Sequence, residues 1–488
     1  MKRSIRKIVA AALVTFQVIL TAAVGFIPAS AEAGTQGHAY SYQVYKADAP
    51  ITVDGAVTEG EAWDNLPWSE NYNWRWCQNN WHLKSDYIAS FKSMWYKNAD
   101  GEAFLYFLFN INDEDGYTPD GEKVGDKYDF GIDETGMGTG APASEVDATA
   151  RRSGGTSLAE GTLSKNTKSG KYYMKHAVKR NDAEHRVTLE IEYQFFAPEY
   201  AADGKTVGFE NNIEWLTNGQ SNAVWSGNRA TSWGSWNEMK NYGALKLHDA
   251  SASTRRAANI YNVNEVIASA DITENGKFTL PTTFAASSDQ LVGWKDAEGK
   301  LYKPGKELTL TANATFEAVT VDFKTLAGAQ VRFKDPTGLR FLSQVKKADY
   351  DALGAAATAT GTLILPTDLL GTGELTLEAL KDKTEGKDYL NVTNDGWLNA
   401  ETAEADGAYT FSGAIVGIKK GNYNRNFSAV GYLTVTYADG TTANFYGGYT
   451  AENATSIKTV AEKALADAAA NPDKYTEAEK AILESYTK

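Results

Sequence analysis

The chain has 488 residues, of which 42% are hydrophobic and 23% are charged, and its formal net charge is −14. At roughly 150 residues per domain, this length predicts about three domains with apolar cores, and the composition excludes a disordered chain. The negative charge argues against a nucleic-acid partner, because phosphate contacts need a basic surface, and against adhesion to an anionic membrane.

Residues 1–33 are predicted to be a signal peptide. Basic residues within positions 2–7 precede an apolar run from Ile8 to Ile27, and small residues offer a cleavage site near Ala31 or Ala33. The run is long for a signal peptide, so an uncleaved membrane anchor stays an alternative. No second stretch is long and apolar enough to span a membrane. We therefore expect a secreted, extracellular protein, with cell-surface association as a further option.

The next region, residues 40–248, is predicted to be a β-sandwich. Ten of the twelve tryptophans lie between Trp63 and Trp236, and Trp63 itself is expected in the core. The run from Ala103 to Ile111 is apolar on both faces, which is typical of a strand in the middle of a sandwich. A later strand alternates instead, with four apolar residues on one face: Val187, Leu189, Ile191 and Tyr193.

The remaining chain is also predicted to be mainly β, which makes the whole protein a mainly β, multidomain chain. The small, polar residues 249–259 are predicted as a linker, residues 260–322 as a small β-rich module, and residues 325–488 as a C-terminal β-rich domain with terminal helices. Asp439-Gly440 marks a hairpin turn. Ser456 is expected to cap the first terminal helix, and Thr476 with Glu479 forms a capping box for the last.

Catalytic signatures are missing from the sequence. It holds no G-x-S-x-G, H-E-x-x-H, P-loop or C-x-x-C motif. Its five histidines have no ligand spacing, and its one cysteine, Cys77, is expected to be a buried small hydrophobe. No Asp/Glu pair stands out as a glycosidase acid and nucleophile. We therefore expect a non-catalytic protein.

One acidic loop is a candidate metal site. Asp113 and Asp115 directly follow the buried run from Ala103 to Ile111, and calcium prefers several oxygen ligands. A structural calcium ion is one hypothesis, and a solvated turn is the equal alternative. No other cofactor is expected.

Six segments in order resemble one family of binding modules. They are "ITVDGAVTEGEAW", "FLYFLFNINDED", "DKYDFGID", "DATAR", "KTVGFENNIEW" and "SWNEMKNYGALKL", spread over residues 45–248. In order and spacing they resemble the family-nine carbohydrate-binding module of extracellular glycan-degrading proteins. The resemblance implies a two-sheet β-sandwich that binds a plant-type polysaccharide or oligosaccharide, with chain ends as one option. Such a module holds a sugar between two tryptophans, with charged and amide groups on its hydroxyls.

The resemblance assigns roles to particular positions. Trp236 matches the second sandwich tryptophan, and Arg151 matches the hydroxyl-binding arginine. Asp129 falls where the family carries a ligand-binding glutamate, one methylene longer. Lys123 stands where the first tryptophan is expected, so that half of the slot is missing or comes from elsewhere.

Other aromatic residues are candidates for the missing wall. Trp81, Trp76 and Tyr117 are the candidate replacements, and Trp233 is a further candidate for the site. Trp74 and Trp76 alternate onto one face of a predicted strand, which also suits packing between the sheets. Aromatic faces suit sugars because the C–H edges of a pyranose are apolar.

The downstream regions carry two further resemblances. Residues 260–322 resemble the small β-grasp repeat of bacterial surface proteins, and residues 325–488 resemble a C-terminal region of exported Gram-positive proteins. The second of these resemblances implies no activity.

Three other functions compete with sugar binding. One is a structural or adhesive surface protein without sugar affinity, which the lysine at position 123 favours. A second is a haem-binding electron-transfer domain, but Met174 and His176 would point from the same face of one strand and could not clamp a haem. The third is an undetected glycoside hydrolase.

Overall fold

A computed structural model gives the structure of the chain and describes most of it in two units. The described residues are 40–57, 60–69, 89–112, 127–136, 151–157, 161–166, 172–184, 186–215, 221–224, 242–263, 265–283, 289–371, 374–384, 388–449 and 453–488. The predicted signal peptide lies outside these residues. One unit ends at Thr279 and also takes in Glu307–Phe316, and the other comprises Leu280–Lys306 and Glu317–Lys488.

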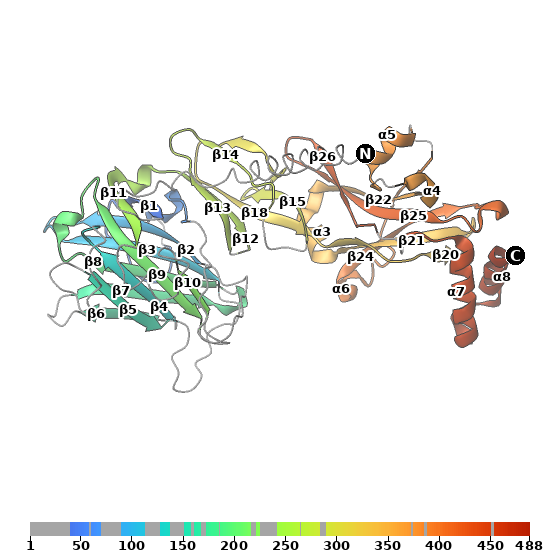
Figure 1. The fold of residues 1–488 in the computed structure, drawn as a ribbon, viewed down its shortest axis with the longest axis horizontal. Helices are drawn as coiled ribbons and strands as arrows, with labels where there is room; N and C mark the ends of the chain where they lie inside the picture. The colour runs from blue at the N-terminus through green and yellow to red at the C-terminus, as the bar shows by residue number, and fades with distance from the viewer. Residues whose placement is uncertain are drawn as a thin grey trace, which may run out of the picture. The chain divides into compact units, whose positions relative to one another are not determined.

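The first unit is a two-sheet β-sandwich, as predicted (Figure 1). Its strands follow the order β5-β4-β9-β11-β1-β2-β3-β8-β7-β6, with β10 beside β9. Their bounds are β1 Ser41–Lys46, β2 Ala89–Lys97, β3 Ala103–Asn112, β4 Lys127–Asp133, β5 Arg151–Ser157, β6 Gly161–Asn166, β7 Tyr172–Asn181, β8 Arg186–Gln194, β9 Thr206–Trp215, β10 Ser221–Val224 and β11 Gly243–Ser251. Strand β1 pairs in parallel with β11 over most of its length and with β2 only at Tyr45 and Lys46, so it joins the two sheets at one edge.

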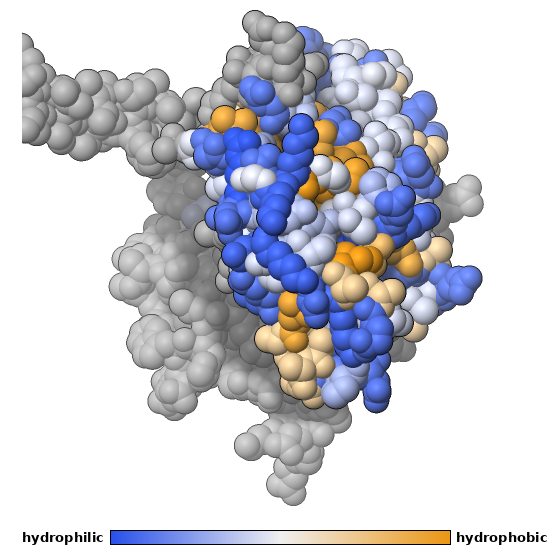
Figure 2. All heavy atoms as spheres, turned by 90° about the vertical axis from the view of Figure 1, so that its right-hand side faces the viewer, coloured by the Kyte–Doolittle hydropathy of each residue, from blue (hydrophilic) through white to orange (hydrophobic). Residues whose placement is uncertain are grey.

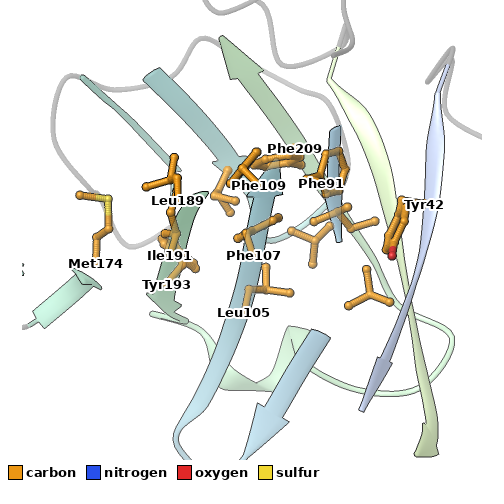
Figure 3. Packing of buried hydrophobic residues seen from close by; sticks show 14 of the residues in the cluster. Tyr42, Phe91, Leu105, Phe107, Phe109, Met174, Leu189, Ile191, Tyr193 and Phe209 are labelled. Atoms are coloured by element: carbon orange, nitrogen blue, oxygen red, sulfur yellow. The ribbon is translucent and has the colours of Figure 1, made fainter. Parts of the chain in front are cut away.

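The main core lies between the two sheets (Figure 3). Phe107 on β3 stacks on Phe209 of β9, with ring centroids 4.5 Å apart, so side chains from opposite sheets meet there. Phe91 on β2 packs edge-on against the same Phe209 ring. The four alternating residues of β8 face this core and are at most 2% exposed: Val187, Leu189, Ile191 and Tyr193. The predicted alternation is confirmed.

Strand β3 is buried on both faces, as its unbroken apolar run predicts. Its second face, with Tyr106 and Leu108, contributes to a separate core beneath the residues that follow β1. Trp63, 1% exposed in a short 3₁₀ helix over Ala62–Asn65, belongs to this core, which confirms its predicted burial. The outer face of β3 is therefore buried by a folded connection rather than by a third sheet.

The stretch around Ile51 and Val53 is apolar and β-branched, a composition typical of a strand. Both side chains are buried, but these residues join no sheet. Their backbone donors bond to carboxylates instead: the Thr52 amide donates to Glu61, and the Asp54 and Gly55 amides donate to Glu190 Oε2 at 2.9 and 2.8 Å. Side chains thus satisfy the backbone groups that a neighbouring strand would otherwise satisfy.

The first unit continues beyond the sandwich. Residues 249–259 form the end of β11, a 3₁₀ turn and the start of β12, and three of their alanines are fully buried: Ala252, Ala257 and Ala258. Antiparallel pairs follow, β12 (Ala257–Asn262) with β13 (Glu265–Asp271) and β14 (Lys277–Thr279) with β17 (Glu307–Thr309). The Trp68 indole donates to the Tyr261 hydroxyl at 2.6 Å, which fixes β12 to the sandwich. The predicted domain boundaries near 248 and 260 stay predictions.

The second unit is built mainly from two antiparallel sheets. One has the order β19-β21-β20 with β24 on the other side of β21, and the other has the order β23-β22-β25-β26. Their strands are β19 Phe323–Thr325, β20 Gln330–Arg332, β21 Gly338–Lys346, β22 Ala357–Pro366, β23 Leu390–Thr393, β24 Ala408–Val416, β25 Phe427–Thr436 and β26 Thr442–Tyr446. A hairpin pairs β15 (Gln290–Asp296) with β16 (Leu301–Tyr302), and both belong to a five-stranded sheet of order β13-β12-β18-β15-β16, with β18 at Ala314–Val321.

Helices make up the rest of the second unit. They are α3 Lys347–Leu353, α4 Thr367–Leu370, α5 Leu377–Thr384, α6 Ala403–Asp406, α7 Ile457–Ala470 and α8 Glu477–Thr487. Three local predictions are confirmed: Gly440 turns the β25–β26 hairpin at φ 79°, Ser456 caps α7, and Thr476 with Glu479 caps α8. None of the described helices is long and apolar enough to cross a membrane.

Candidate functional site

Strand β4 presents one apolar and one polar face. Tyr128 and Ile132 are fully buried in the core between the sheets. Because successive residues of a strand point to opposite faces, positions 129, 131 and 133 belong to the other face. The "DKYDFGID" motif therefore packs through its tyrosine and isoleucine and places positions 129 and 133 on the face away from the core.

The neighbouring strands continue this pattern on both sides of β4. In β5, Arg151 pairs with Asp133 and Gly155 with Asp129; in β9, Asn212 pairs with Asp129 and Glu210 with Gly131. Paired residues of an antiparallel sheet share a face. We call this face the polar face, and it comprises positions Lys127, Asp129, Gly131, Asp133, Arg151, Ser153, Gly155, Ser157, Gly208, Glu210, Asn212 and Glu214.

Two carboxylates of the polar face are buried and hydrogen-bonded. Asp133 is 1% exposed, and its Oδ1 accepts from the Thr135 hydroxyl at 2.6 Å. Glu210 is 2% exposed, and its Oε1 accepts from the Asn211 amide at 2.9 Å. Buried acidic groups need such partners because desolvation disfavours their charge. This end of the polar face is therefore covered.

Tyr242 covers part of the polar face. The side chain is fully buried, and a Cβ added at Gly131 would lie 2.2 Å from its hydroxyl oxygen. Glycine is thus required at position 131, because any larger residue would collide with the tyrosine ring. Two segments that lie far apart in the sequence, "DKYDFGID" and "NYGALKL", meet at this contact.

Glu134 fixes the end of β4. It is fully buried, and its Oε1 accepts from the Tyr193 hydroxyl at 2.6 Å and the Phe196 amide at 2.8 Å. Its Oε2 accepts from the Ala197 amide at 2.9 Å. Burial raises the pKa of Glu134 to about 7, and these hydrogen bonds act in the opposite direction. The carboxyl group ties β4 to the end of β8, which holds the polar face in register.

On the core side of β4, Tyr128 contacts the two residues considered as haem ligands. Its hydroxyl lies 3.1 Å from His176 Nδ1 and 3.4 Å from Met174 Sδ. Both side chains are buried on β7 and reach the same hydroxyl group. They therefore lie on one side of their strand, as their spacing predicts, and cannot bind opposite faces of a haem.

Two of the predicted site residues lie at described positions of one face of the sheet. Positions 129 and 151 lie on the same face of neighbouring strands, four residues apart in register, which is roughly 13 Å along the strands. The other predicted residues lie outside the described residues: Trp236, Trp233, Trp81, Trp76, Tyr117, Lys123, and the candidate calcium ligands Asp113 and Asp115. Their roles stay predictions. Among the described residues, no group of three or more His, Cys, Asp or Glu side chains could hold a metal ion.

Three residues of this region were not singled out from the sequence. Glu210 and Asn212 lie on the polar face, and Tyr242 covers it. The signal for the first two was present in "KTVGFENNIEW", where Val207, Phe209 and Ile213 alternate with polar positions. Only pairing with β4 places those polar positions beside Asp129.

Comparison with known proteins gives a limited likeness. No protein-family model matches the chain, and no curated protein matches its sequence. Two solved structures of a family 9 carbohydrate-binding module from Caldicellulosiruptor kristjanssonii, in complex with cellotriose and with glucose, are each 16% identical with a TM-score of 0.30. Each alignment covers 43% of this chain, and 95% and 97% of those chains respectively. A TM-score of 0.30 is too low to assign a fold, so the sandwich rests on its own strand order and register.

Proposed function

We propose that the first unit is a non-catalytic carbohydrate-binding module of an exported protein. The observation that carries the proposal is the register that places Asp129, Arg151 and Asn212 on one face of three neighbouring strands. A carboxylate accepts hydrogen bonds, a guanidinium donates them, and an amide does both. That combination suits the rim of hydroxyls on a sugar, each of which both donates and accepts.

The aromatic part of the site is assigned to Trp236, with Trp81, Trp76 and Tyr117 as candidates for the opposite wall and Trp233 as a further candidate for the site. Trp236 precedes Tyr242 by six positions in the same sequence segment, and Tyr242 contacts the polar face at Gly131. An aromatic ring over the apolar C–H edge of a pyranose contributes about 0.5–1.5 kcal/mol beyond the area that it buries. A single site of this kind has a dissociation constant on the order of 10 µM to 1 mM.

Calorimetry on the chain from residue 34 onward tests the proposal. The chain is titrated with glucose, cellobiose and xylo-oligosaccharides. A fragment ending at residue 248 is unsuitable because Ala252 and Val266 complete the second core and Tyr261 binds Trp68. Saturable heat with one of these sugars is expected.

Two variants locate the site. Asp129→Asn removes a charged acceptor and is expected to weaken binding about 10- to 150-fold, since hydrogen bonds to charged groups contribute about 1.5–3 kcal/mol. Trp236→Ala is expected to abolish measurable binding. Asp100→Asn is the matched control, because Asp100 is exposed in the β2–β3 turn and Asn suits a turn that precedes Gly101. An equal loss in Asp100→Asn and Asp129→Asn would contradict the assignment.

A structural or adhesive role without sugar affinity is the competing function. The lysine at position 123, where the resemblance expects a tryptophan, is the observation that favours it. Absence of heat with every sugar at millimolar concentration would favour this role. Release of new reducing ends from the same sugars would instead identify a hydrolase.

A further inference from the structure

The second unit contains an open groove of about 910 Å³ beside its short strand β20. Residues 327–331 line one side, and the opposite side is formed by one face of α7, including Thr459, Lys463 and Asp467. These α7 residues are spaced by four along the helix, so they share that face. Pockets that bind small ligands or short peptides usually have volumes of about 300–1,000 Å³.

The strand side of the groove is a backbone edge rather than a face of the sheet. Side chains of a strand alternate between two faces, so a groove over one face would touch every second residue. Here the successive β20 residues Gln330 and Val331 both line it, together with residues 327–329, which precede the strand. Strand β20 pairs with β21 and ends the order of its sheet within the described part of the chain. An edge of this kind offers backbone N–H and C=O groups to an added strand.

The groove is basic although the protein is acidic. Its lining includes Arg340, Lys463 and Lys474 against a single carboxylate, Asp467, while the whole chain has a net charge of −14. Lys474 is paired with Asp467, which raises the pKa of that lysine. Lys463 is exposed and has no ion-pair partner among the described residues. Two of the three cations in the lining, Lys463 and Arg340, thus have no compensating carboxylate among the described residues.

Arg340 is the second uncompensated cation. Its Nη2 donates to the neutral Gln330 amide oxygen at 2.6 Å, and its Nε is buried without a partner. Burial lowers the pKa of Arg340, and the nearby Arg332 acts in the same direction. A carboxylate in the groove would supply the opposite charge that the described neighbours of Arg340 lack.

Apolar and aromatic residues complete the lining. Phe333 and Tyr475 pack edge to face with centroids 6.0 Å apart, and Val331 and Val460 belong to the core beneath the groove. Figure 2 shows the side of the molecule on which α7 and α8 lie in Figure 1, where hydrophobic patches lie among strongly hydrophilic residues. A ligand in which apolar and charged side chains alternate would match such a surface.

We propose that this groove binds an extended acidic peptide segment, which adds to the edge of β20 as a further strand and places carboxylates near Lys463 and Arg340. Main-chain hydrogen bonds to the edge would provide affinity, and the cations would select acidic sequences. A backbone edge favours a polypeptide over an anionic polysaccharide, because a sugar chain cannot continue the ladder of hydrogen bonds.

Fluorescence anisotropy with a labelled hexapeptide of alternating glutamate and valine tests the proposal on the chain from residue 34 onward. The expected result is saturable binding that weakens with salt and slows amide hydrogen exchange in β20. The same peptide with N-methylated backbone amides is expected to bind at least about tenfold more weakly. Equal binding of the two peptides would overturn strand addition.

Charge reversal locates the site without disturbing the fold. Lys463→Glu changes an exposed helix position and is expected to weaken binding about three- to tenfold. Lys420→Glu makes the same change in net charge at an exposed residue outside the groove and is expected to have no effect. Equal effects of the two variants, or binding of polygalacturonate without binding of the peptide, would refute the proposal. Trp236→Ala separates this groove from the sugar site, since it should leave peptide binding unchanged.

Discussion

Lys92 offers a quantitative test of packing in the first unit. It lies in β2 and is 2% exposed; its Nζ donates to the Trp63 carbonyl oxygen at 2.7 Å and lies 4.6 Å from the Trp68 ring centroid. Burial lowers the pKa of Lys92 to about 7, while the Asp64 charge acts in the opposite direction. Desolvation of the ammonium group thus outweighs the attraction of the Asp64 carboxylate.

This pKa shift has a defined sign and magnitude. Between pH 7 and 10.5 the unfolded chain binds a proton at Lys92 that the folded protein has released, so stability rises with pH. From pH 7.5 to 9.5 the increase in the free energy of unfolding is about 2.5 kcal/mol. The window ends below pH 10 because burial raises the pKa of Tyr42 and Tyr106, whose titration lowers stability at higher pH.

The variant Lys92→Met removes this titration and keeps an unbranched side chain of similar length. The Trp63 carbonyl oxygen still accepts from the Leu66 amide at 3.3 Å. Urea unfolding followed by tryptophan fluorescence reports mainly on the first unit, since ten of the twelve tryptophans precede position 237. The stability of the variant relative to the parent chain is expected to fall by about 2.5 kcal/mol from pH 7.5 to 9.5.

Lys205→Met is the matched control for this measurement. Lys205 is exposed, so its replacement should leave the pH dependence of the parent chain unchanged. Parallel pH profiles for the parent chain and Lys92→Met would refute the reasoning. They would mean that Lys92 stays protonated across the window and that the Trp68 ring and the carbonyl compensate its desolvation.

Two further predictions concern single contacts. Gly131→Ala is expected to destabilise the first unit by about 1–3 kcal/mol in urea unfolding, because its Cβ would lie 2.2 Å from the Tyr242 hydroxyl oxygen. Adding Tyr242→Ala to this variant should recover part of the lost stability, and no recovery would mean that the alanine collides with another group. Ser456→Ala is expected to lower the stability of the second unit by about 1 kcal/mol, because the Thr459 amide loses its cap. Circular dichroism during unfolding measures this loss, and an equal loss for the exposed α8 variant Ser485→Ala would contradict it.

Local sequence signals predicted the elements that depend on a few adjacent residues. The Asp439-Gly440 turn, the Ser456 cap and the capping box at Thr476 are each encoded within four positions. The alternation of Val187 to Tyr193 likewise fixes which face of β8 is buried. These predictions succeed because the physical cause lies within the segment itself.

Burial that depends on distant residues could not be predicted in this way. A lysine in a β-strand is expected to face solvent, but the connection containing Trp63 and Trp68 covers Lys92. The segment at Ile51 has the composition of a strand, yet its neighbouring amides bond to Glu61 and Glu190. Both outcomes are decided by chain segments outside the local pattern.

The candidate site depends both on residue identities within short motifs and on the pairing of distant strands. Asp129 and Arg151 came from a resemblance, and only the register of β4 with β5 and β9 shows that they share a face with Glu210 and Asn212. No sequence pattern indicates that Tyr242 closes over Gly131. Strand pairing between residues dozens of positions apart is a non-local property, so the extent of the polar face could not be read from any one motif.

The register also separates the two predicted polar residues into different environments. Arg151 pairs with Asp133, a carboxylate that is 1% exposed, at the end of the face that Tyr242 covers. Asp129 pairs with Gly155 and Asn212, away from that buried carboxylate. A buried carboxylate depends on its surroundings for stability, so a substitution at the position paired with Asp133 tests the packing of the sheet together with the proposed sugar binding. The residues paired with Asp129, Gly155 and Asn212, carry no charge, so a variant at position 129 tests the proposed sugar binding more directly than one at position 151.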